Sequence, residues 1–213
     1  MDKTTGPGLL LGIGAVLLSV ILEGCRLGSF INLPAAVVVF GGTFGVALVN
    51  YPLQAIVSLP KFLKIALTDK SHDTAHVIES FVKLADRARR EGLLALEQEA
   101  ANLDPFARKG VQMVVDGSDP AMVREVLEAD IDAMQRRHHM GIGLFEALGG
   151  FAPTLGIIGT VMGLVNVLGQ LEDPSELGHL IASAFVATLY GVASANLIYL
   201  PLGGKLKLKS HHE

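Results

Sequence analysis

Two threonines, Thr160 and Thr188, are among the side chains best placed in this chain to guide an ion, together with Asn166, Ser194 and Asn196. Each lies in a long apolar stretch, 149–170 or 180–201, that contains no Asp, Glu, Lys or Arg. A hydroxyl oxygen can coordinate a cation, but it does not titrate at ordinary pH and cannot itself carry a proton. The alternative is structural, because a hydroxyl in an apolar setting needs a partner and can bond to a backbone carbonyl of its own helix. The residues alone leave both interpretations open.

Small side chains surround both threonines at helical spacing. In membranes such residues let helix backbones approach closely, so the spacing predicts two membrane helices that pack tightly along this face. The residues concerned are Gly156, Thr160 and Gly163 in the first stretch and Ala184, Thr188, Gly191 and Ala195 in the second.

Neither stretch supplies the ionisable group that an ion- or proton-conducting site at membrane depth usually needs. If the chain conducts ions, a carboxylate must therefore come from another chain. The sequence predicts a complex with a second membrane protein.

The composition is that of a membrane protein, since half of the 213 residues are hydrophobic and the mean hydropathy is +0.47. Four apolar segments, at about 7–24, 31–50, 151–170 and 177–202, are each near the ~20 residues that a helix needs to cross the hydrocarbon core. No strand alternation is visible. We expect an all-α integral membrane protein with four transmembrane helices and a helical cytoplasmic domain inserted between helices 2 and 3.

The basic residues predict the orientation of these helices. All the Lys and Arg residues except Arg26 fall at the N-terminus, between residues 51 and 148, or after residue 202. Because an excess of Lys and Arg marks the cytoplasmic side, both termini are expected there. The expected domains are 1–50 with transmembrane helices 1 and 2, 51–148 as the cytoplasmic domain, 149–202 with helices 3 and 4, and 203–213 as a cytoplasmic tail.

The 51–148 insert carries clear helix signals. Ser71 or Asp73 can cap a helix through Arg90, Gly92 interrupts that helix, and a short helix starts directly after it. Two pairs, Asp104-Pro105 and Asp119-Pro120, combine an N-cap with a first-turn proline. The helix from Pro120 is expected to run into the third apolar segment.

A charged cluster stands on either side of Gly92. It consists of Arg87, Arg89, Arg90, Glu91, Glu97 and Glu99. One interpretation is an ordinary solvated helix face. The other is an electrostatic docking surface for a partner of complementary charge, since such surfaces set register and association rate. No catalytic constellation accompanies the cluster, so we do not expect an enzyme.

Two prolines lie near the inner ends of the last two segments, Pro153 at the start of the third and Pro201 at the end of the fourth. Breaks in membrane helices survive only where neighbours or water satisfy the freed carbonyls. Both prolines are candidate hinges. For Pro201, simple helix termination is the alternative.

The chain resembles the A-subunits of the bacterial flagellar stator, the MotA/PomA family, over nearly its whole length. The motifs that carry the resemblance are 89–97 (RREGLLALE), 152–160 (APTLGIIGT) with Gly163, and 187–191 (ATLYG) followed by Asn196 and Pro201. The 152–160 motif alone is shared with the related ExbB/TolQ proteins.

The resemblance implies an ion-driven motor of the bacterial inner membrane. A pentamer of the chain would surround a dimer of a MotB/PomB-like B-subunit, whose membrane Asp binds the transported proton or sodium ion. The ring would drive the rotor protein FliG, and neither a further cofactor nor a nucleic acid is implied. The family's functional residues map onto Thr160 and Thr188 in the ion pathway, Pro153 and Pro201 in conformational coupling, and Arg89, Arg90 and Glu97 at the rotor.

The resemblance also bears on the ion and on the chain's end. Threonine at both 160 and 188 slightly favours sodium, although threonine also occurs in proton-driven members. Members usually continue past the fourth span into a longer cytoplasmic helix, whereas this chain stops at Glu213, so a truncation is expected.

Three other functions compete with this one. An ExbB/TolQ-like energising proton-channel subunit would have three spans and lack the Arg89–Glu97 motif. A secondary transporter would show inverted repeats with helices broken at the midplane, which the two pairs of spans do not show. A scaffold would give the threonines no role.

Overall fold

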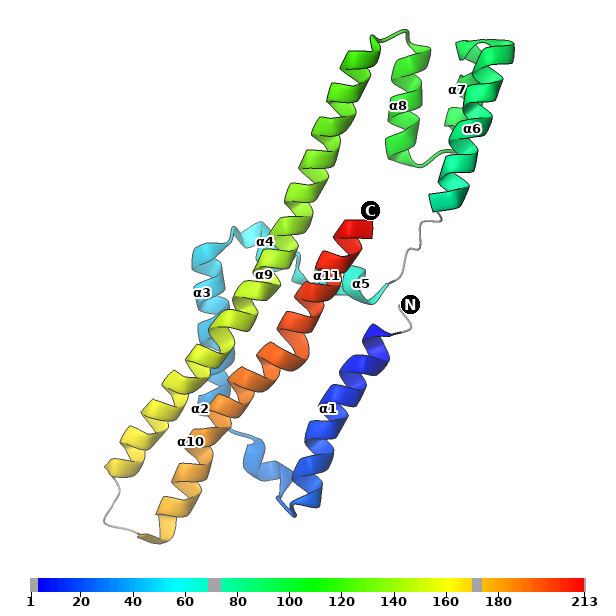
Figure 1. Ribbon diagram of the computed structural model, residues 1–213. Coiled ribbons are helices and arrows are strands. Elements are labelled where there is room, and N and C mark those ends of the chain that lie inside the picture. The colour runs from blue at the N-terminus through cyan, green and yellow to red at the C-terminus, as the bar shows by residue number, and fades with distance from the viewer. Residues whose placement is uncertain (1–3, 69–73, 170–173, 213) are drawn as a thin grey trace. The chain divides into compact units, whose positions relative to one another are not determined.

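The computed structural model describes residues 4–68, 74–169 and 174–212, and within these ranges the regular structure is entirely helical (Figure 1). Four helical stretches are long and apolar enough to cross a membrane: Thr5–Leu22, Leu27–Asn50, Pro120–Leu168 and Leu180–His211. The expected four-span, all-α architecture is confirmed.

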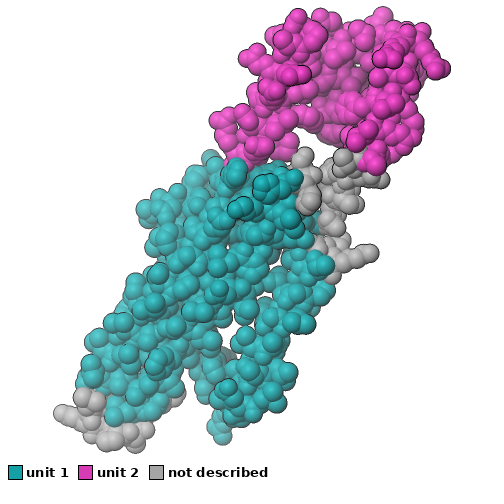
Figure 2. Space-filling view, in the orientation of Figure 1, with its two compact units in different colours: residues 1–69, 138–212 teal, residues 70–137, 213 magenta. Residues whose placement is uncertain are grey.

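The chain divides into two compact units (Figure 2). The first contains residues 1–69 and 138–212, and the second contains residues 70–137. The second unit is shorter than the expected 51–148 domain, because residues 51–68 and 138–148 contribute to the core of the first unit. Whether those two stretches lie in the cytoplasm stays a prediction.

The first unit contains the membrane-spanning helices. Its elements are α1 (Thr5–Leu22), the 3-10 turn η1 (Leu27–Phe30), α2 (Leu33–Ala36), the π-helical η2 (Val37–Gly41), α3 (Gly42–Asn50), α4 (Leu53–Val57), α5 (Leu59–Leu67), part of α9 (Pro120–Leu168), α10 (Pro174–Ser194), the π-helical η4 (Ala195–Tyr199) and α11 (Leu200–His212).

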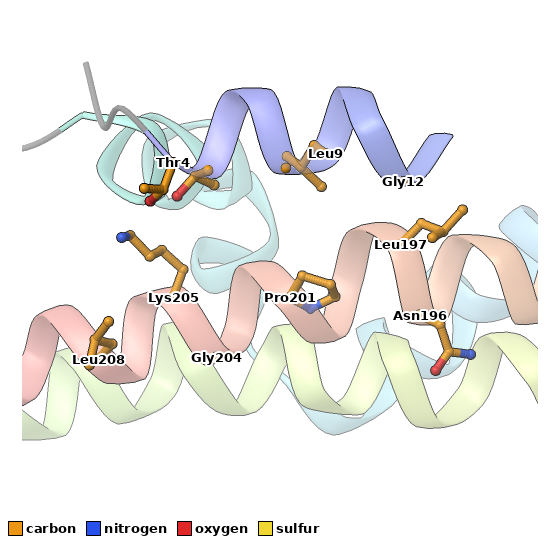
Figure 3. A pocket seen from close by; sticks show the side chains of 11 residues that line it. Thr4, Leu9, Gly12, Asn196, Leu197, Pro201, Gly204, Lys205 and Leu208 are labelled. Carbon is orange, nitrogen blue, oxygen red and sulfur yellow. The ribbon is translucent and has the colours of Figure 1, made fainter. Parts of the chain in front are cut away.

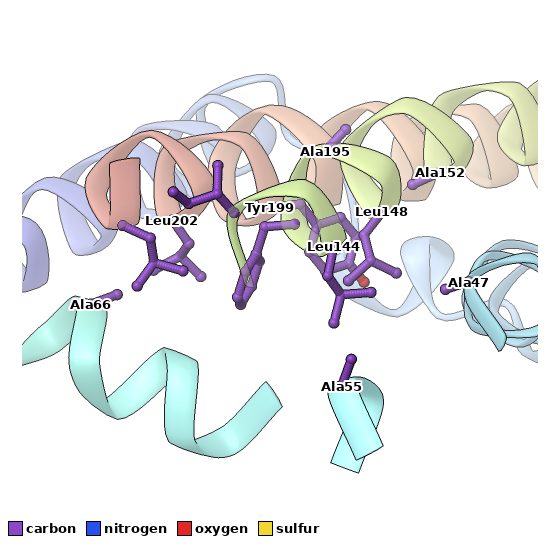
Figure 4. Packing of buried hydrophobic residues seen from close by; sticks show 12 residues of the cluster. Ala47, Ala55, Ala66, Leu144, Leu148, Ala152, Ala195, Tyr199 and Leu202 are labelled. Atoms are coloured by element: carbon purple, nitrogen blue, oxygen red, sulfur yellow. The ribbon is translucent and has the colours of Figure 1, made fainter. Parts of the chain in front are cut away.

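The core of this unit lies where α9 meets η4 and α11 (Figure 4). Leu144 and Leu148 of α9 are fully buried there, and Leu202 packs with them. Alanines of α3, α4 and α5 cover the same cluster, because their small side chains let these helices come close. By contrast, α1 has no buried residue, as expected of a helix that faces lipid.

Two short helices, α4 and α5, were not predicted, because the helix signals recognised in the 51–148 insert begin only at Ser71. Both pack against the core through Ala55 and Ala66. The side-chain amine of Lys209 donates hydrogen bonds to the carbonyls of Ile65 and Thr68 and so caps the end of α5.

The second unit contains α6 (Thr74–Glu91), the 3-10 turn η3 (Leu93–Ala95), α7 (Leu96–Ala100), α8 (Pro105–Val115) and the first residues of α9. Its core consists of Leu84, Leu96, Ala100 and Val111.

The predicted helix signals in this unit hold. The Asp104 carboxylate accepts hydrogen bonds from the backbone amides of Phe106 and Ala107, and Asp119 accepts one from Ala121. The helix from Asp119-Pro120 runs into the third apolar segment, as predicted. The proposed caps Ser71 and Asp73 lie outside the described residues.

Gly92 ends α6 with φ at +88°, a backbone conformation open mainly to glycine. This conformation turns the chain from the last turn of α6 into η3 and α7.

Candidate functional site

The α9–α10 interface is as tight as the small residues predict. A Cβ atom built on Gly156 would lie 2.8 Å from the carbonyl oxygen of Ala187, and one on Gly163 would lie 2.6 Å from the Cβ of Ala184. A Cβ on Gly191 would collide with the carbonyl of Ala152. Backbone therefore meets backbone along this seam, which confirms the close approach expected from the sequence.

Thr160 and Thr188 face each other across this seam. Their side-chain oxygens lie 2.5 Å apart, and both residues are half-buried. The Thr160 hydroxyl also lies 3.1 Å from the carbonyl oxygens of Gly156, on its own helix, and Ala184, on the other. The Thr188 hydroxyl lies 3.4 Å from the Gly156 oxygen. The two hydroxyls thus bond to each other and to both helices, so the purely intrahelical alternative does not describe them.

The chemistry of this cluster follows from its atoms. Two hydroxyls and two carbonyls bring four oxygen atoms together, and oxygen atoms are the ligands that hard cations prefer. No group in the cluster titrates at ordinary pH. The arrangement can therefore stabilise a cation or a water molecule passing it, but it can neither bind a proton nor neutralise a charge.

The two candidate hinge prolines lie further along the same pair of helical stretches, Pro153 on α9 and Pro201 on α11, which continues from α10 through η4. Pro153 lies inside the continuous helix α9, so the carbonyl of Gly149, four residues earlier, lacks its usual amide donor. A Cβ on Gly149 would lie 2.5 Å from the side chain of Leu200, the residue before Pro201. Gly149, whose carbonyl lacks its donor because of Pro153, thus packs against the residue that precedes Pro201.

Pro201 does not end its helix, in contrast to the alternative considered from the sequence. The π-helical η4 precedes it, and α11 continues through it to His212. A π-helical segment shifts the hydrogen-bond pattern, so the chain passes the proline without a break in helical structure. The 203–213 segment, expected as a tail, is helical through residue 212.

Asn32, Ser183 and Tyr190 form a polar contact that the sequence analysis missed. The Asn32 amide nitrogen donates to the carbonyl oxygen and hydroxyl of Ser183, at 3.0 and 2.5 Å. The Tyr190 hydroxyl donates to the carbonyl of Phe30 and accepts from the backbone amide of Asn32, at 3.2 Å. These bonds fix the start of the second span to α10.

The sequence carried a signal for the helix cap at Asn32, though not for its bonds to Ser183. Asn32 caps α2 by accepting from the amide of Ala35, and Pro34 follows in the first turn. This resembles the cap-plus-proline signature that located α8 and α9, with one residue between the cap and the proline. It was overlooked because it lies at the edge of a long apolar run.

The charged cluster of the second unit separates into two groups. The half-buried Arg87 forms ion pairs with Glu91 and Glu99, and the hydrogen bond and charge of Glu91, followed by those of Glu99, raise the pKa of the Arg87 guanidinium. Arg89, Arg90 and Glu97 are exposed, and each lacks an ion pair to any described residue. The first group closes the α6–α7 turn, whereas the second is presented to solvent.

Within the described ranges, no three His, Cys, Asp or Glu side chains gather as a metal site would require. Cys25 is exposed and unpaired. Both the threonine cluster and the Asn32 contact join separate helices of the first unit.

Comparison with known proteins agrees with this fold. Residues 98–213 match the model of the MotA/TolQ/ExbB proton channel family. The chain is 34% identical to Motility protein A of Bacillus subtilis (strain 168), over 100% of this chain and 80% of the relative. It is 35% identical to Chemotaxis protein PomA of Vibrio alginolyticus, over 100% of this chain and 83% of the relative.

A solved structure leads to the same family. A chain of the flagellar MotAB stator complex from Bacillus subtilis superposes with a TM-score of 0.91 at 33% identity, covering 99% of this chain and 83% of that one. The resemblance to MotA/PomA proteins is thereby confirmed, and this chain belongs to the MotA/TolQ/ExbB proton channel family.

Proposed function

We propose that this chain is the A-subunit of an ion-driven rotary stator, which couples proton or sodium flow across the bacterial inner membrane to flagellar rotation. The observation that carries the proposal is the match over the full chain, in sequence and in fold, to stator A-subunits. The four spans favour this function over an ExbB/TolQ-like energising subunit, for which three are expected.

The partner follows from the chemistry of the site. Hydroxyl and carbonyl oxygens at Thr160 and Thr188 can line an ion path, but the two stretches around them contain no carboxylate. A B-subunit of the MotB/PomB type supplies the missing membrane Asp. Several copies of this chain, five by analogy with the family, surround a dimer of that subunit.

The rotor contact is assigned to the exposed group of charges. Arg89, Arg90 and Glu97 lie on either side of the Gly92 turn, and ion pairs of Arg87 with Glu91 and Glu99 stabilise that turn. Their free charges fit a partner with complementary charges, which we propose to be FliG. In this topology the second unit and both termini lie in the cytoplasm, where the rotor is.

Expression in a motile host that lacks its own stator tests the proposal. The chain is produced together with a MotB/PomB-type subunit, and swimming is scored in sodium-containing and sodium-depleted media. Swimming only with sodium supports a sodium-driven stator, and swimming in both media supports a proton-driven one. Absence of motility despite stable membrane insertion of both chains contradicts the proposal and favours the ExbB/TolQ-like function.

A further inference from the structure

A cavity of about 450 Å³ opens between α1 and α11 in the first unit, within the ~300–1,000 Å³ of typical ligand sites. Its wall changes character along its length. Thr4 and Lys205 lie towards one end, with Leu208 beyond them, whereas Leu9, Gly12 and Leu197 lie towards the other end, beside Asn196 (Figure 3).

The residues of this wall complement an amphipathic ligand with an anionic head group. Lysine side chains at the ends of membrane helices extend their amine towards the interface while the methylene stem stays on apolar surface. Lys205 is half-buried and extends towards Thr4 across the cavity. We propose that the cavity binds an anionic phospholipid, with the phosphate held by Lys205 and the Thr4 hydroxyl and an acyl chain against Leu9, Gly12 and Leu197.

The surroundings of the cavity favour an anionic lipid over a neutral one. Helix α5 packs against both α1 and α11 at this end, and it exposes Lys61 and Lys64 beside the apolar Leu63 and Ile65. Such a mixture is typical of a helix that lies in the membrane interface.

Lys207 and Lys209 of α11 add to the charge of this end, and the segments 51–68 and 200–212 contain no Asp or Glu. Each basic residue near an anionic membrane surface contributes about 1 kcal/mol of attraction. The end of the unit that holds the cavity therefore carries an excess of positive charge. By the proposed topology this is the cytoplasmic leaflet, but the lipid assignment does not depend on which leaflet it is.

The cavity remains open because glycines line it. A Cβ on Gly8 or Gly204 would meet no atom within 4 Å, and one on Gly12 would lie 3.5 Å from Leu197. A large side chain at Gly8 can thus occupy the cavity without pushing against the protein. Gly14, on the same helix, also has open space around it but does not line the cavity, so it offers a matched control.

The test measures phospholipids retained by the complex of this chain with its B-type subunit. The complex is extracted in mild detergent from membranes containing phosphatidylglycerol and phosphatidylethanolamine, and bound lipid is quantified by native mass spectrometry. We expect the wild type to retain phosphatidylglycerol selectively, Gly8→Leu to lose it, and Gly14→Leu to retain it. Lys205→Gln should lower the retained amount about fivefold, which corresponds to the ~1 kcal/mol of one such charge.

Two outcomes overturn the inference. Equal retention of phosphatidylglycerol by wild type and Gly8→Leu shows that the lipid binds elsewhere. Weaker assembly of Gly8→Leu with unchanged lipid content shows that a second copy of the chain fills the cavity instead. Neither readout uses motility, so failure of the lipid site is distinguishable from failure of the stator function.

Discussion

The side-chain oxygens of Thr160 and Thr188 lie 2.5 Å apart and join helices α9 and α10. The cluster contains four oxygen atoms, namely the two hydroxyl oxygens and the carbonyl oxygens of Gly156 and Ala184, but only two hydroxyl hydrogens that can be donated. Unused lone pairs therefore remain however the hydrogens are arranged. The pair joins the two helices, and we propose that its oxygen atoms also line the ion path.

Replacing Thr188 with Val tests the second of these roles. Valine keeps the branched shape but removes the hydroxyl, so we expect ion-dependent rotation to fall strongly. Interhelical hydrogen bonds in membranes contribute only about 0.6 kcal/mol on average, so the assembled complex should remain stable. The measurement is swimming speed against external ion concentration, beside the thermal stability of the purified complex.

Thr154→Val is the matched control, because Thr154 is an exposed threonine of α9 whose hydroxyl bonds only to the carbonyl of Phe151. It should swim as the wild type does, and Thr188→Ser should retain most activity. Unchanged speed in Thr188→Val would remove this hydroxyl from the ion pathway.

The glycine seam predicts a different kind of defect. In Gly156→Ala the new methyl would lie 2.8 Å from the Ala187 oxygen, which forces the two backbones apart. Overpacking of this kind costs about 1–3 kcal/mol, so the complex should unfold at lower temperature and lose activity with it. In contrast, Gly150→Ala on the same helix meets no atom within 4 Å and should leave the unfolding temperature unchanged or slightly raised. Equal effects of the two substitutions would show that the seam does not determine stability.

The seam is also where the sequence was most informative. In a membrane, small residues at every third or fourth position favour close packing of helices, and α9 and α10 pack closely through them. The helix signals of the second unit were equally local: Asp104 and Asp119 cap their helices by bonds to amides two or three residues away. Such features can be predicted because nothing distant in the chain decides them.

Features that depend on distant residues could not be predicted in this way. Asn32 bonds to Ser183, 151 positions away, and Lys209 caps α5 from 144 positions away. Nor does composition indicate that Pro201 follows a π-helical segment and stays within a helix. The roles of Thr160, Thr188 and the exposed charges require partner chains, so they stay predictions here.

Charge reversal separates the docking group from the structural group at the Gly92 turn. Arg89→Glu alters an exposed side chain without an ion pair among the described residues, so rotation should fall while the fold and membrane insertion stay intact. Arg87→Glu faces Glu91 and Glu99 and should disturb the turn itself, with loss of helix content in the second unit. Circular dichroism and rotation of tethered cells distinguish the two effects.

A compensating reversal in the rotor sharpens this test. If Arg89 docks on an acidic residue of FliG, changing that acid to Lys should restore rotation to Arg89→Glu but not to Arg87→Glu. Loss of membrane insertion in Arg89→Glu would contradict a docking role for this side chain.

The contact between Gly149 and Leu200 makes Pro153 and Pro201 a coupled pair. Pro153→Ala gives the Gly149 carbonyl its missing amide donor, and Pro201→Ala adds an amide donor directly after the π-helical η4, so both variants should be as stable as the wild type or more stable. If flexibility of the helices at these two prolines couples ion passage to rotation, both variants should also drive slower rotation. Because both substitutions stiffen the same contact between α9 and α11, the double variant should be slowed by less than the two single effects combined.

Pro60→Ala is the control, since Pro60 occupies the first turn of α5, where no amide donor is missing. Rotation rate and unfolding temperature are measured together, because slower rotation with a lower unfolding temperature would indicate a folding defect and contradict a coupling role.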